Sequence, residues 1–462
     1  MSAANQNIGA NAGDPSSRQI AIAEGALGRS FAFDGHRQIT LDAFLAEVRG
    51  VAAGLPEAPS AINLCENRYR FLVAFCAVAL RGQINLLPSS RTPAAIGDVL
   101  RQSADSYCIS DVALSPEPPR LYTLPEQLPQ LLSEQLHQPS GPMPGVDADA
   151  VAMIGFTSGS TGAPKPNPKT WRSLRISTAQ NHAALRHLWP DGQTLPLIAT
   201  VPPQHMYGME LSVLLPLFAS VAVHSARPFF PEDVAQALRE AAVPPLLVTT
   251  PVHLRALVES GIALPSLAGI VTATAPLAQA LAAAAEQRFG CEVRELFGAT
   301  EICIVAHRRT ARDEAWTAYP GVHLHPQPDG TLVEAPHLPV SVALADLVEL
   351  RVGNTFVLCG RQADLLEIAG KRASLGDLTR RLQSVPGVID GVMLQLDACD
   401  VTGVRRIAAL AVAPGIDAAT ILRALRLSVD PVFLPRRLRI VDALPRNDTG
   451  KLPREALLRL LR

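Results

Sequence analysis

Short apolar runs alternate with stretches of helical periodicity along much of the chain. Apolar runs bounded by turn-forming residues indicate buried strands, and apolar positions that recur every three to four residues indicate helices. We expect strands over residues 61–64, 84–87, 151–156, 195–201, 221–224, 246–250, 269–274 and 293–297. We expect helices over residues 69–81, 93–102, 231–242 and 277–289. This alternation is typical of parallel sheets that carry helices on both faces.

The pattern changes after residue 320. Residues 321–334 and 340–358 favour antiparallel strands, with a turn at Asp329-Gly330. Beyond Gly360 we expect a smaller α+β arrangement, with helices over 375–383 and 418–427 and strands over 391–396 and 407–412. The fold class that we predict is α/β: a large N-terminal domain of parallel αβα subdomains plus a β-rich subdomain, with a small mobile α+β C-terminal domain.

These patterns also predict the domain limits. Residues 1–20 are polar and we expect them to form a disordered tail. The N-terminal core then covers residues 21–362, and the mobile C-terminal domain covers residues 363–462. Within the core we expect subdomains over about 21–124, 150–319 and the β-rich 320–360, joined by a Pro/Gln/Ser-rich connection over 125–147.

Composition excludes several classes of protein. The chain is 48% hydrophobic and 18% charged, which is ordinary for a globular protein. The formal net charge of -1 gives no general attraction to nucleic acid. Residues 364–462 nevertheless hold 16 basic and 11 acidic residues, which favours an acidic partner or phosphates, although a statistical fluctuation explains it as well.

Cysteine usage and apolar run length bear on location. The seven cysteines are scattered without a C-x-x-C pair, so neither a disulfide framework nor a zinc site is indicated. The N-terminus lacks the apolar core of a signal peptide. The apolar run at 212–223 is too short to span a bilayer. We therefore expect a cytoplasmic protein without a membrane span.

The segment 157–165 carries the clearest chemical signal. It combines hydroxyls, two glycines and a lysine directly after the apolar run 151–156. Glycines let backbone N–H groups converge on an anion, and hydroxyls and an ammonium add further contacts. This composition favours a polyphosphate site, although a flexible Gly/Ser loop is the plain alternative. The residues are Thr157, Ser158, Gly159, Ser160, Thr161, Gly162, Ala163, Pro164 and Lys165.

Lysine is rare in this chain. Only Lys165, Lys169, Lys371 and Lys451 occur, against 37 arginines. Base composition of the gene explains such a bias. A lysine that persists under it is also a candidate for a site that needs a compact ammonium. Lys451 follows the turn-forming run 447–450, so it lies on a functional turn or in a solvated tail.

Further polar motifs follow expected strands. One is His205-Met206-Tyr207-Gly208, a second runs from Ala273 to Pro276, and a third runs from Phe297 to Glu301. Ligands bind at the carboxyl ends of strands in open α/β sheets. Asp346 and Arg361 come later in the chain.

Together these residues resemble the adenylate-forming superfamily of acyl- and aryl-CoA ligases, stand-alone adenylation enzymes and luciferases. The resemblance runs from about residue 35 to the end. It implies that the 157–165 loop holds the β- and γ-phosphates of ATP. It further implies that Phe297, in place of the usual tyrosine, packs on adenine, with Gly298 beside it. Ala273, Thr274, Ala275 and Pro276 would form the other wall of that site.

The resemblance assigns roles to five more residues. Asp346 and Arg361 would bind the ribose. Thr300 would contact the α-phosphate, and Glu301 would bind Mg²⁺, which usually takes one or two carboxylates plus phosphate oxygens. Lys451 would bring the substrate carboxylate and the α-phosphate together, since a cation offsets the repulsion between two anions.

The acyl pocket is expected around His205. His205 would gate or line it, or would simply be a hydrogen-bonded loop histidine. The remaining pocket candidates are Tyr207, Gly208, Met209, Thr274 and Gly298.

The resemblance implies a reaction. A carboxylic acid and ATP give an acyl-adenylate and pyrophosphate, and a phosphopantetheine thiol of CoA or of an acyl carrier protein then displaces AMP. The pattern around residues 370–375 is most similar to ligases of aryl-polyene and xanthomonadin-type pathways, which load a hydroxybenzoate-like acid on a carrier protein. A medium-chain acyl ligase, an ATP-dependent amide ligase and a catalytically idle nucleotide-binding protein are the alternatives.

Four positions depart from the family pattern. Phe297 lacks the phenol hydroxyl, Pro166 replaces a glycine after the loop lysine, Glu367 replaces a common lysine or asparagine, and Ala363 stands where a charged hinge residue is usual. We therefore expect the domain rotation to pivot differently in this protein.

Overall fold

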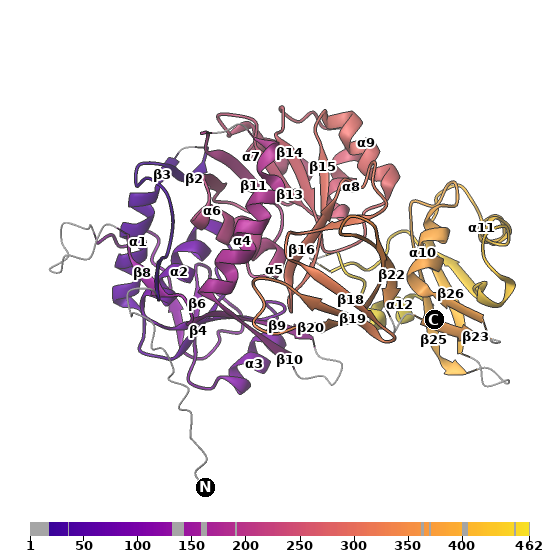
Figure 1. Cartoon of the computed structure of the whole chain (residues 1–462), viewed down its shortest axis with the longest axis horizontal. Coiled ribbons are helices and arrows are strands. Elements are labelled where there is room, and N and C mark those ends of the chain that lie inside the picture. The colour runs from indigo at the N-terminus through magenta and orange to yellow at the C-terminus, as the bar shows by residue number, and fades with distance from the viewer. Residues whose placement is uncertain are drawn as a thin grey trace, which may run out of the picture. The chain divides into compact units, whose positions relative to one another are not determined.

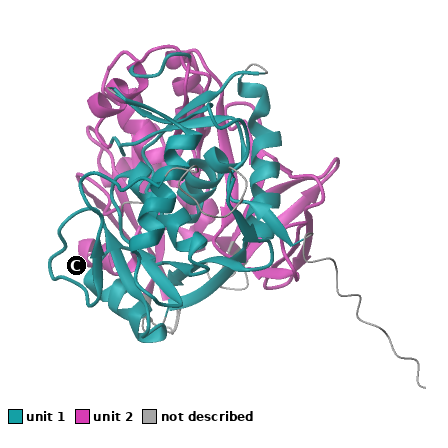
Figure 2. Ribbon diagram, turned by 90° about the vertical axis from the view of Figure 1, so that its left-hand side faces the viewer, with its two compact units in different colours: residues 1–228, 240–243 teal, residues 229–239, 244–462 magenta. Residues whose placement is uncertain are grey.

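The computed structural model describes residues 18–35, 37–131, 143–158, 164–189, 192–361, 365–368, 371–399, 405–447 and 450–461 (Figure 1). Contacts within the chain divide it into two compact units, coloured separately in Figure 2. Unit 1 comprises residues 1–228 and 240–243, and unit 2 comprises residues 229–239 and 244–462. The segment 229–239 thus belongs with the second half of the chain.

Unit 1 contains a six-stranded sheet in the order β10-β9-β5-β4-β6-β7. Its strands run parallel except β10, which forms a hairpin with β9. The bounds are β4 Ser60–Asn63, β5 Ile84–Leu87, β6 Tyr107–Ser110, β7 Leu121–Thr123, β9 Val151–Ser158 and β10 Pro164–Thr170. The helices of unit 1 include α1 Leu41–Gly54, α2 Arg68–Leu80, α3 Pro93–Gln102 and α4 Trp171–Leu185.

A second group of strands in unit 1 follows the order β11-β12-β2-β3. Its bounds are β2 Ser30–Asp34, β3 Arg37–Thr40, β11 Leu195–Ala199 and β12 Val221–His224. After β11 come α5 Met206–Met209, a π-helix at Glu210–Leu214 and α6 Leu215–Phe218. A small antiparallel pair joins β1 Gln19–Ala21 to β8 Gly145–Asp147. Gln19 and Ile20 are therefore strand residues, so the disordered tail expected over residues 1–20 does not extend to residue 20.

Unit 2 begins with parallel strands and continues with antiparallel ones. Strands β13, β14 and β15 pair in parallel, and β16, β17, β22 and β21 extend them in antiparallel pairs. The bounds are β13 Leu246–Thr249, β14 Gly269–Thr272, β15 Val293–Ala299, β16 Cys303–Arg308, β17 Trp316–Ala318, β21 Asp346–Arg351 and β22 Thr355–Arg361. The helices are α7 Pro231–Arg239, α8 Pro251–Glu259 and α9 Gln279–Phe289.

A three-stranded antiparallel sheet lies between β17 and β21 in the sequence. Its strands are β18 His323–Gln327, β19 Gly330–Glu334 and β20 Val342–Leu344. The antiparallel region expected after residue 320 is confirmed. The turn is shifted by one residue, because Gln327 pairs with Gly330 and leaves Pro328-Asp329 as its two central residues.

The C-terminal part of unit 2 has a sheet with an apolar core on each face. Its elements are β23 Leu365–Ile368, β24 Lys371–Ser374, α10 Leu375–Gln383, β25 Asp390–Cys399, β26 Arg405–Val412, α11 Ala418–Leu425, β27 Arg437–Ile440 and α12 Arg454–Leu461. Along β26, Ile407 and Ala409 pack with Leu382 of α10, whereas Ala408 and Leu410 pack with Leu457 of α12. Successive strand residues point to opposite faces, so the apolar run of β26 supplies both cores.

The α/β fold class is confirmed, with a large N-terminal part and a smaller C-terminal part. The helices predicted over 93–102 and 375–383 and the strands predicted over 84–87 and 221–224 match α3, α10, β5 and β12 at both ends. The long helix α4 was not predicted. The boundary predicted near residue 363 falls outside the described residues. None of the helices in the described ranges has the length and apolar character needed to cross a bilayer.

Candidate active site

The β9–β10 hairpin carries the two ends of the expected phosphate loop. Thr157 pairs with Lys165, and Ser158 pairs with Pro164. Lys165 is exposed and Thr157 is half-buried. The residues between these ends, Gly159, Ser160, Thr161, Gly162 and Ala163, lie outside the described residues.

Asn167 braces this hairpin. Its Nδ2 atom donates to the carbonyl oxygen of Gly155 at 3.2 Å, to that of Lys165 at 3.1 Å and to Oγ1 of Thr157 at 3.4 Å. Asn167 is 8% exposed. Asn167 was not predicted from the sequence, although a pattern pointed to it. Asparagine and proline are both unfavourable in strands, so an asparagine between two prolines of a strand indicates that its side-chain amide bonds to nearby backbone.

The second candidate segment of unit 1 follows β11. His205 stands at the N-cap position of α5, and Tyr207, Gly208 and Met209 are buried within that short helix. A Cβ on Gly208 would lie 2.0 Å from the carbonyl oxygen of Pro202. This close approach of two backbone segments admits only glycine.

A buried arginine holds the same segment. Arg68 is 0% exposed and lies in the first turn of α2. One of its terminal nitrogens donates to the carbonyl oxygens of Ala199 and Val201, both at 2.8 Å. The other donates to Oγ of Ser212, which itself donates to the carbonyl oxygen of Gly208 at 2.6 Å.

These partners of Arg68 are all neutral. Burial, followed by the nearby charge of Arg227, lowers the pKa of the Arg68 guanidinium, because neither water nor a carboxylate offsets its charge. Its Nε atom has no hydrogen-bond partner. Arg68 was not predicted from the sequence, since an arginine early in a helix is usually exposed.

The same segment also contains a buried carboxylate. Glu210 opens the π-helix and is 0% exposed. Its Oε2 atom accepts from Oγ of Ser177 at 2.6 Å and from Nδ2 of Asn181 at 2.9 Å. Both donors belong to α4, so two helices distant in sequence hold the segment that contains His205.

Unit 2 presents the residues expected to face the nucleotide base. The segment from Ala273 to Pro276 follows the end of β14, and Ala273 is 7% exposed. Thr274 has a φ of 80°, which is unusual for a β-branched residue. Such strain persists only where the surroundings enforce it, and it clusters at functional sites.

Phe297 lies on the neighbouring strand β15. Its ring centroid is 5.6 Å from that of Trp316 and 5.8 Å from that of Phe356. Gly298 comes next, where the β15–β16 pairing is irregular, and a Cβ there would lie 2.3 Å from the carbonyl oxygen of Cys303. The aromatic cluster therefore supports one side of Phe297.

Thr300 and Glu301 occupy the turn between β15 and β16. Both are half-buried, so oxygen atoms of each can reach solvent or a ligand. The donor set, a carboxylate beside a hydroxyl, fits a magnesium ion that takes its other ligands from phosphate and water.

Asp346 begins β21 and pairs with Arg361 on β22. Its backbone carbonyl oxygen accepts from Oγ1 of Thr331 at 2.6 Å, and its side chain is half-buried. The pairing brings the two residues expected to bind ribose together, although the side chain of Arg361 lies outside the described residues.

Lys451 is exposed at the end of a braced turn. The backbone N–H of Lys451 donates to Oδ1 of Asn447, and the N–H of Asn447 donates to the carbonyl oxygen of Lys451, both at 2.9 Å. Arg446 donates to the carbonyl oxygen of Gly450 at 2.8 Å and to both carboxylate oxygens of Asp390 at 2.9 Å. Arg446 and Asp390 were not predicted, because their pairing joins positions far apart in the sequence.

Comparison with known proteins identifies the class. The sequence model of the family described as AMP-binding enzyme matches residues 21–332. The 4-coumarate–CoA ligase of Halorhodospira halophila is 30% identical over 309 residues, which cover 64% of this chain and 73% of that protein. Enterobactin synthase component E of Escherichia coli K12 is 24% identical over 356 residues, 67% of this chain and 65% of that protein.

Solved structures agree on the fold. The ATP-bound MatB from Rhodopseudomonas palustris superposes with a TM-score of 0.76 at 18% identity, over 92% of this chain and 94% of that one. Because the family model matches residues 21–332, the chain belongs to the AMP-binding enzyme family of adenylate-forming enzymes. Its CoA-ligase relatives indicate an AMP-forming acid–thiol ligase.

Proposed function

We propose that this ligase activates an aryl carboxylic acid and transfers it to a phosphopantetheine thiol. In the first half-reaction the acid carboxylate attacks the α-phosphorus of ATP, an acyl-adenylate forms and pyrophosphate leaves. In the second the thiol attacks the acyl carbon, a thioester forms and AMP leaves. The observation that carries the proposal is the presence of Glu301 and Lys451 in turns, and of Asp346 at the start of a strand, in a chain of the AMP-binding family.

The residues take the following roles. The hairpin from Thr157 to Lys165 binds the β- and γ-phosphates, with Ser158, Gly159, Ser160, Thr161 and Gly162 between its ends. Glu301 binds Mg²⁺, which would neutralise phosphate charge, and Thr300 contacts the α-phosphate. Asp346 and Arg361 bind the ribose hydroxyls, since a carboxylate can accept from both of them.

The base lies between two walls. Phe297 packs against one face of adenine, as aromatic rings do with offset or edge contacts. The other wall is formed by Ala273, Thr274, Ala275 and Pro276, with Gly298 leaving room beside the ring.

An aryl acid is the substrate class we favour. The 4-coumarate–CoA ligase relative acts, by its name, on an aryl acid. His205, Tyr207 and Met209 would line the acyl pocket, with Gly208, Thr274 and Gly298. A half-buried histidine with buried aromatic and thioether neighbours suits a flat ring.

The thiol acceptor is proposed to be an acyl carrier protein, with CoA as the other candidate. The excess of basic residues over 364–462 would steer an acidic protein partner. The part from about residue 363 would turn between the half-reactions, which presents Lys451 only during adenylation.

The test is a pyrophosphate-exchange screen over hydroxybenzoates, cinnamates and medium-chain acids, with the wild type and Lys451→Ala. We expect exchange with aryl acids, and a loss on the order of 10²–10³ in the variant, as for removal of one preorganised electrostatic contact. Arg459→Ala is the control, because Arg459 is also a C-terminal cation and is exposed on α12. Normal exchange in Lys451→Ala would refute the role of that residue.

A further inference from the structure

Glu295 lies behind both walls of the proposed adenine site. It is in β15, two residues before Phe297, and its side chain is 3% exposed. A carboxylate this deeply buried does not contact a ligand directly. Its partners determine what it does.

One carboxylate oxygen holds the wall that follows β14. Oε1 accepts from the backbone N–H of Leu277 at 2.9 Å. Pro276 has no N–H, so Leu277 carries the first backbone donor after it. This bond fixes the end of a wall that contains Thr274 in its strained left-handed conformation. Strain of this kind needs a firm anchor close by.

The other carboxylate oxygen of Glu295 is connected to the wall that contains Phe297. Oε2 accepts from Nε of Arg308 at 2.8 Å and from Oγ1 of Thr310 at 2.6 Å, and the terminal nitrogen of Arg308 lies 2.7 Å away. The Arg308 guanidinium stacks over Trp316, 4.4 Å from the ring centroid. Trp316 in turn contacts Phe297.

We propose that Glu295 is a positioning residue for the nucleotide, which sets the distance between the wall ending at Leu277 and the ring of Phe297. The proposal rests on the proposed function, because it takes these two segments as the adenine site. Every described hydrogen bond to the carboxylate comes from one of the two sides. Glu295 therefore holds the two walls at a fixed separation and does not itself bind ATP.

The test compares Glu295→Gln with a matched control. We expect the KM for ATP in pyrophosphate exchange to rise about tenfold, since small misplacements of a binding wall cost this much or more. The KM for the acid and kcat should change less than twofold. Discrimination of ATP against GTP should fall, which a general loss of stability would not cause.

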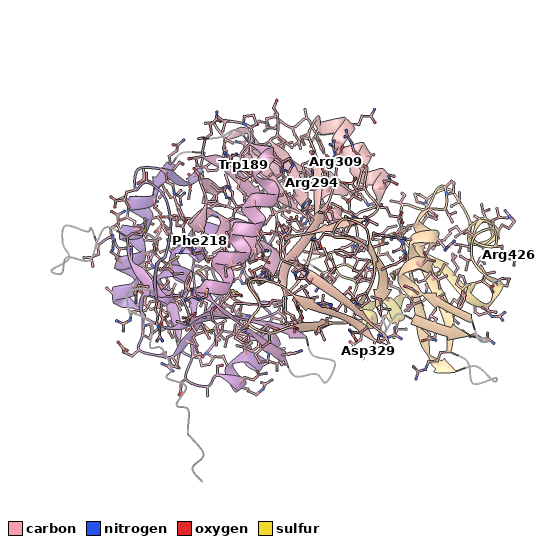
Figure 3. The ribbon with its side chains drawn as sticks, viewed as in Figure 1. Trp189, Phe218, Arg294, Arg309, Asp329 and Arg426 are labelled. Atoms are coloured by element: carbon pink, nitrogen blue, oxygen red, sulfur yellow. The ribbon has the colours of Figure 1, made fainter. Side chains whose placement is uncertain are left out.

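Glu286→Gln is that control. Glu286 accepts from Arg309 at 2.9 and 2.8 Å and from the backbone N–H of Val293 at 3.0 Å, so it shares with Glu295 an arginine and a backbone donor but has no hydroxyl partner, and it lies on α9 with neither partner in the wall segments. Arg309 and Arg294, labelled in Figure 3, both also contact Glu292. The control should lower the melting temperature and leave the KM for ATP unchanged.

The following outcomes decide the proposal. An unchanged KM for ATP in a folded Glu295→Gln protein overturns it, as does an equal rise in the control. If Glu295→Gln does not fold, Thr310→Val removes one hydrogen bond at nearly constant volume, and a rise in the KM for ATP is again required.

If no acid supports exchange by the wild type, the proposed function fails, and the dissociation constant of Mg–ATP, measured by calorimetry, replaces KM. Wild-type protein that does not bind Mg–ATP also overturns the inference.

Discussion

Two loops of this protein follow parallel strands and are held in different ways. The segment with His205, in unit 1, is fixed by Arg68, whose hydrogen-bond partners are two backbone carbonyls and a hydroxyl. The segment from Ala273 to Pro276, in unit 2, is fixed by Glu295, which is paired with Arg308. One loop depends on a charge among neutral dipoles, and the other depends on an ion pair.

The difference predicts unequal sensitivity. The charge of Arg68 is stabilised by several neutral acceptors and by no carboxylate. Removal of Arg68 therefore leaves several buried acceptors without a donor and leaves no buried charge behind. In the ion pair, the carboxylate of Glu295 is only 3% exposed, so removal of Arg308 leaves a buried charge without its counter-ion. We therefore expect the segment from Ala273 to Pro276 to be more sensitive to the loss of its cation than the segment with His205.

The largest effect is expected for Arg308→Met. The buried carboxylate of Glu295 loses its counter-ion, so the free energy of unfolding should fall by about 4 kcal/mol. Chemical denaturation followed by circular dichroism measures it. Arg68→Met is the counterpart: three oxygen acceptors lose their donor, and the loss should be about 2 kcal/mol. A larger loss for Arg68→Met than for Arg308→Met would contradict the comparison.

A smaller effect is expected for Gly208→Ala. The added Cβ would meet the carbonyl oxygen of Pro202, so the backbone must shift, at a cost of about 1–3 kcal/mol. Because Gly208 belongs to the proposed acyl pocket, the KM for the acid should rise while the KM for ATP stays constant. Gly28→Ala is the control, since no atom lies within 4 Å of a Cβ built there. Equal changes in both KM values would show that the segment does not belong to the acyl side alone.

The smallest effect is expected for Ser212→Ala, which removes the hydroxyl between Arg68 and Gly208. Arg68 keeps its two carbonyl acceptors, so the free energy of unfolding should fall by roughly 1 kcal/mol. A double-mutant cycle with Arg68→Met measures the coupling between the two side chains. Additive losses would mean that Ser212 does not relay the position of Arg68.

Much of the fold was predictable because local signals agree with it. The helix over 93–102 begins after Thr92, whose side chain accepts from Ala95, and the helix over 375–383 begins after a similar cap at Ser374. Helix α4 was missed because its buried face includes Ser177, Thr178 and Asn181, so its apolar periodicity is weak.

The residues of the candidate site also fall into a group that the sequence predicted and a group that it did not. Motif residues such as Lys451, Glu301 and Asp346 stand out by type and order. The residues that hold them do not, because their partners lie far away in the sequence: Arg68 bonds with Ser212, 144 positions on. A buried charge has no signature in a single sequence until the fold supplies its partner.

The turn before Lys451 has a mechanical consequence. Arg446 connects that turn to Asp390 at the start of β25, and Asn447 closes the turn on itself. The Lys451 backbone is therefore coupled to the C-terminal sheet and is not a freely swinging strap. Any large displacement of this lysine must carry β25 with it, so a movement that brought Lys451 to the proposed site would have to move the C-terminal sheet as one body.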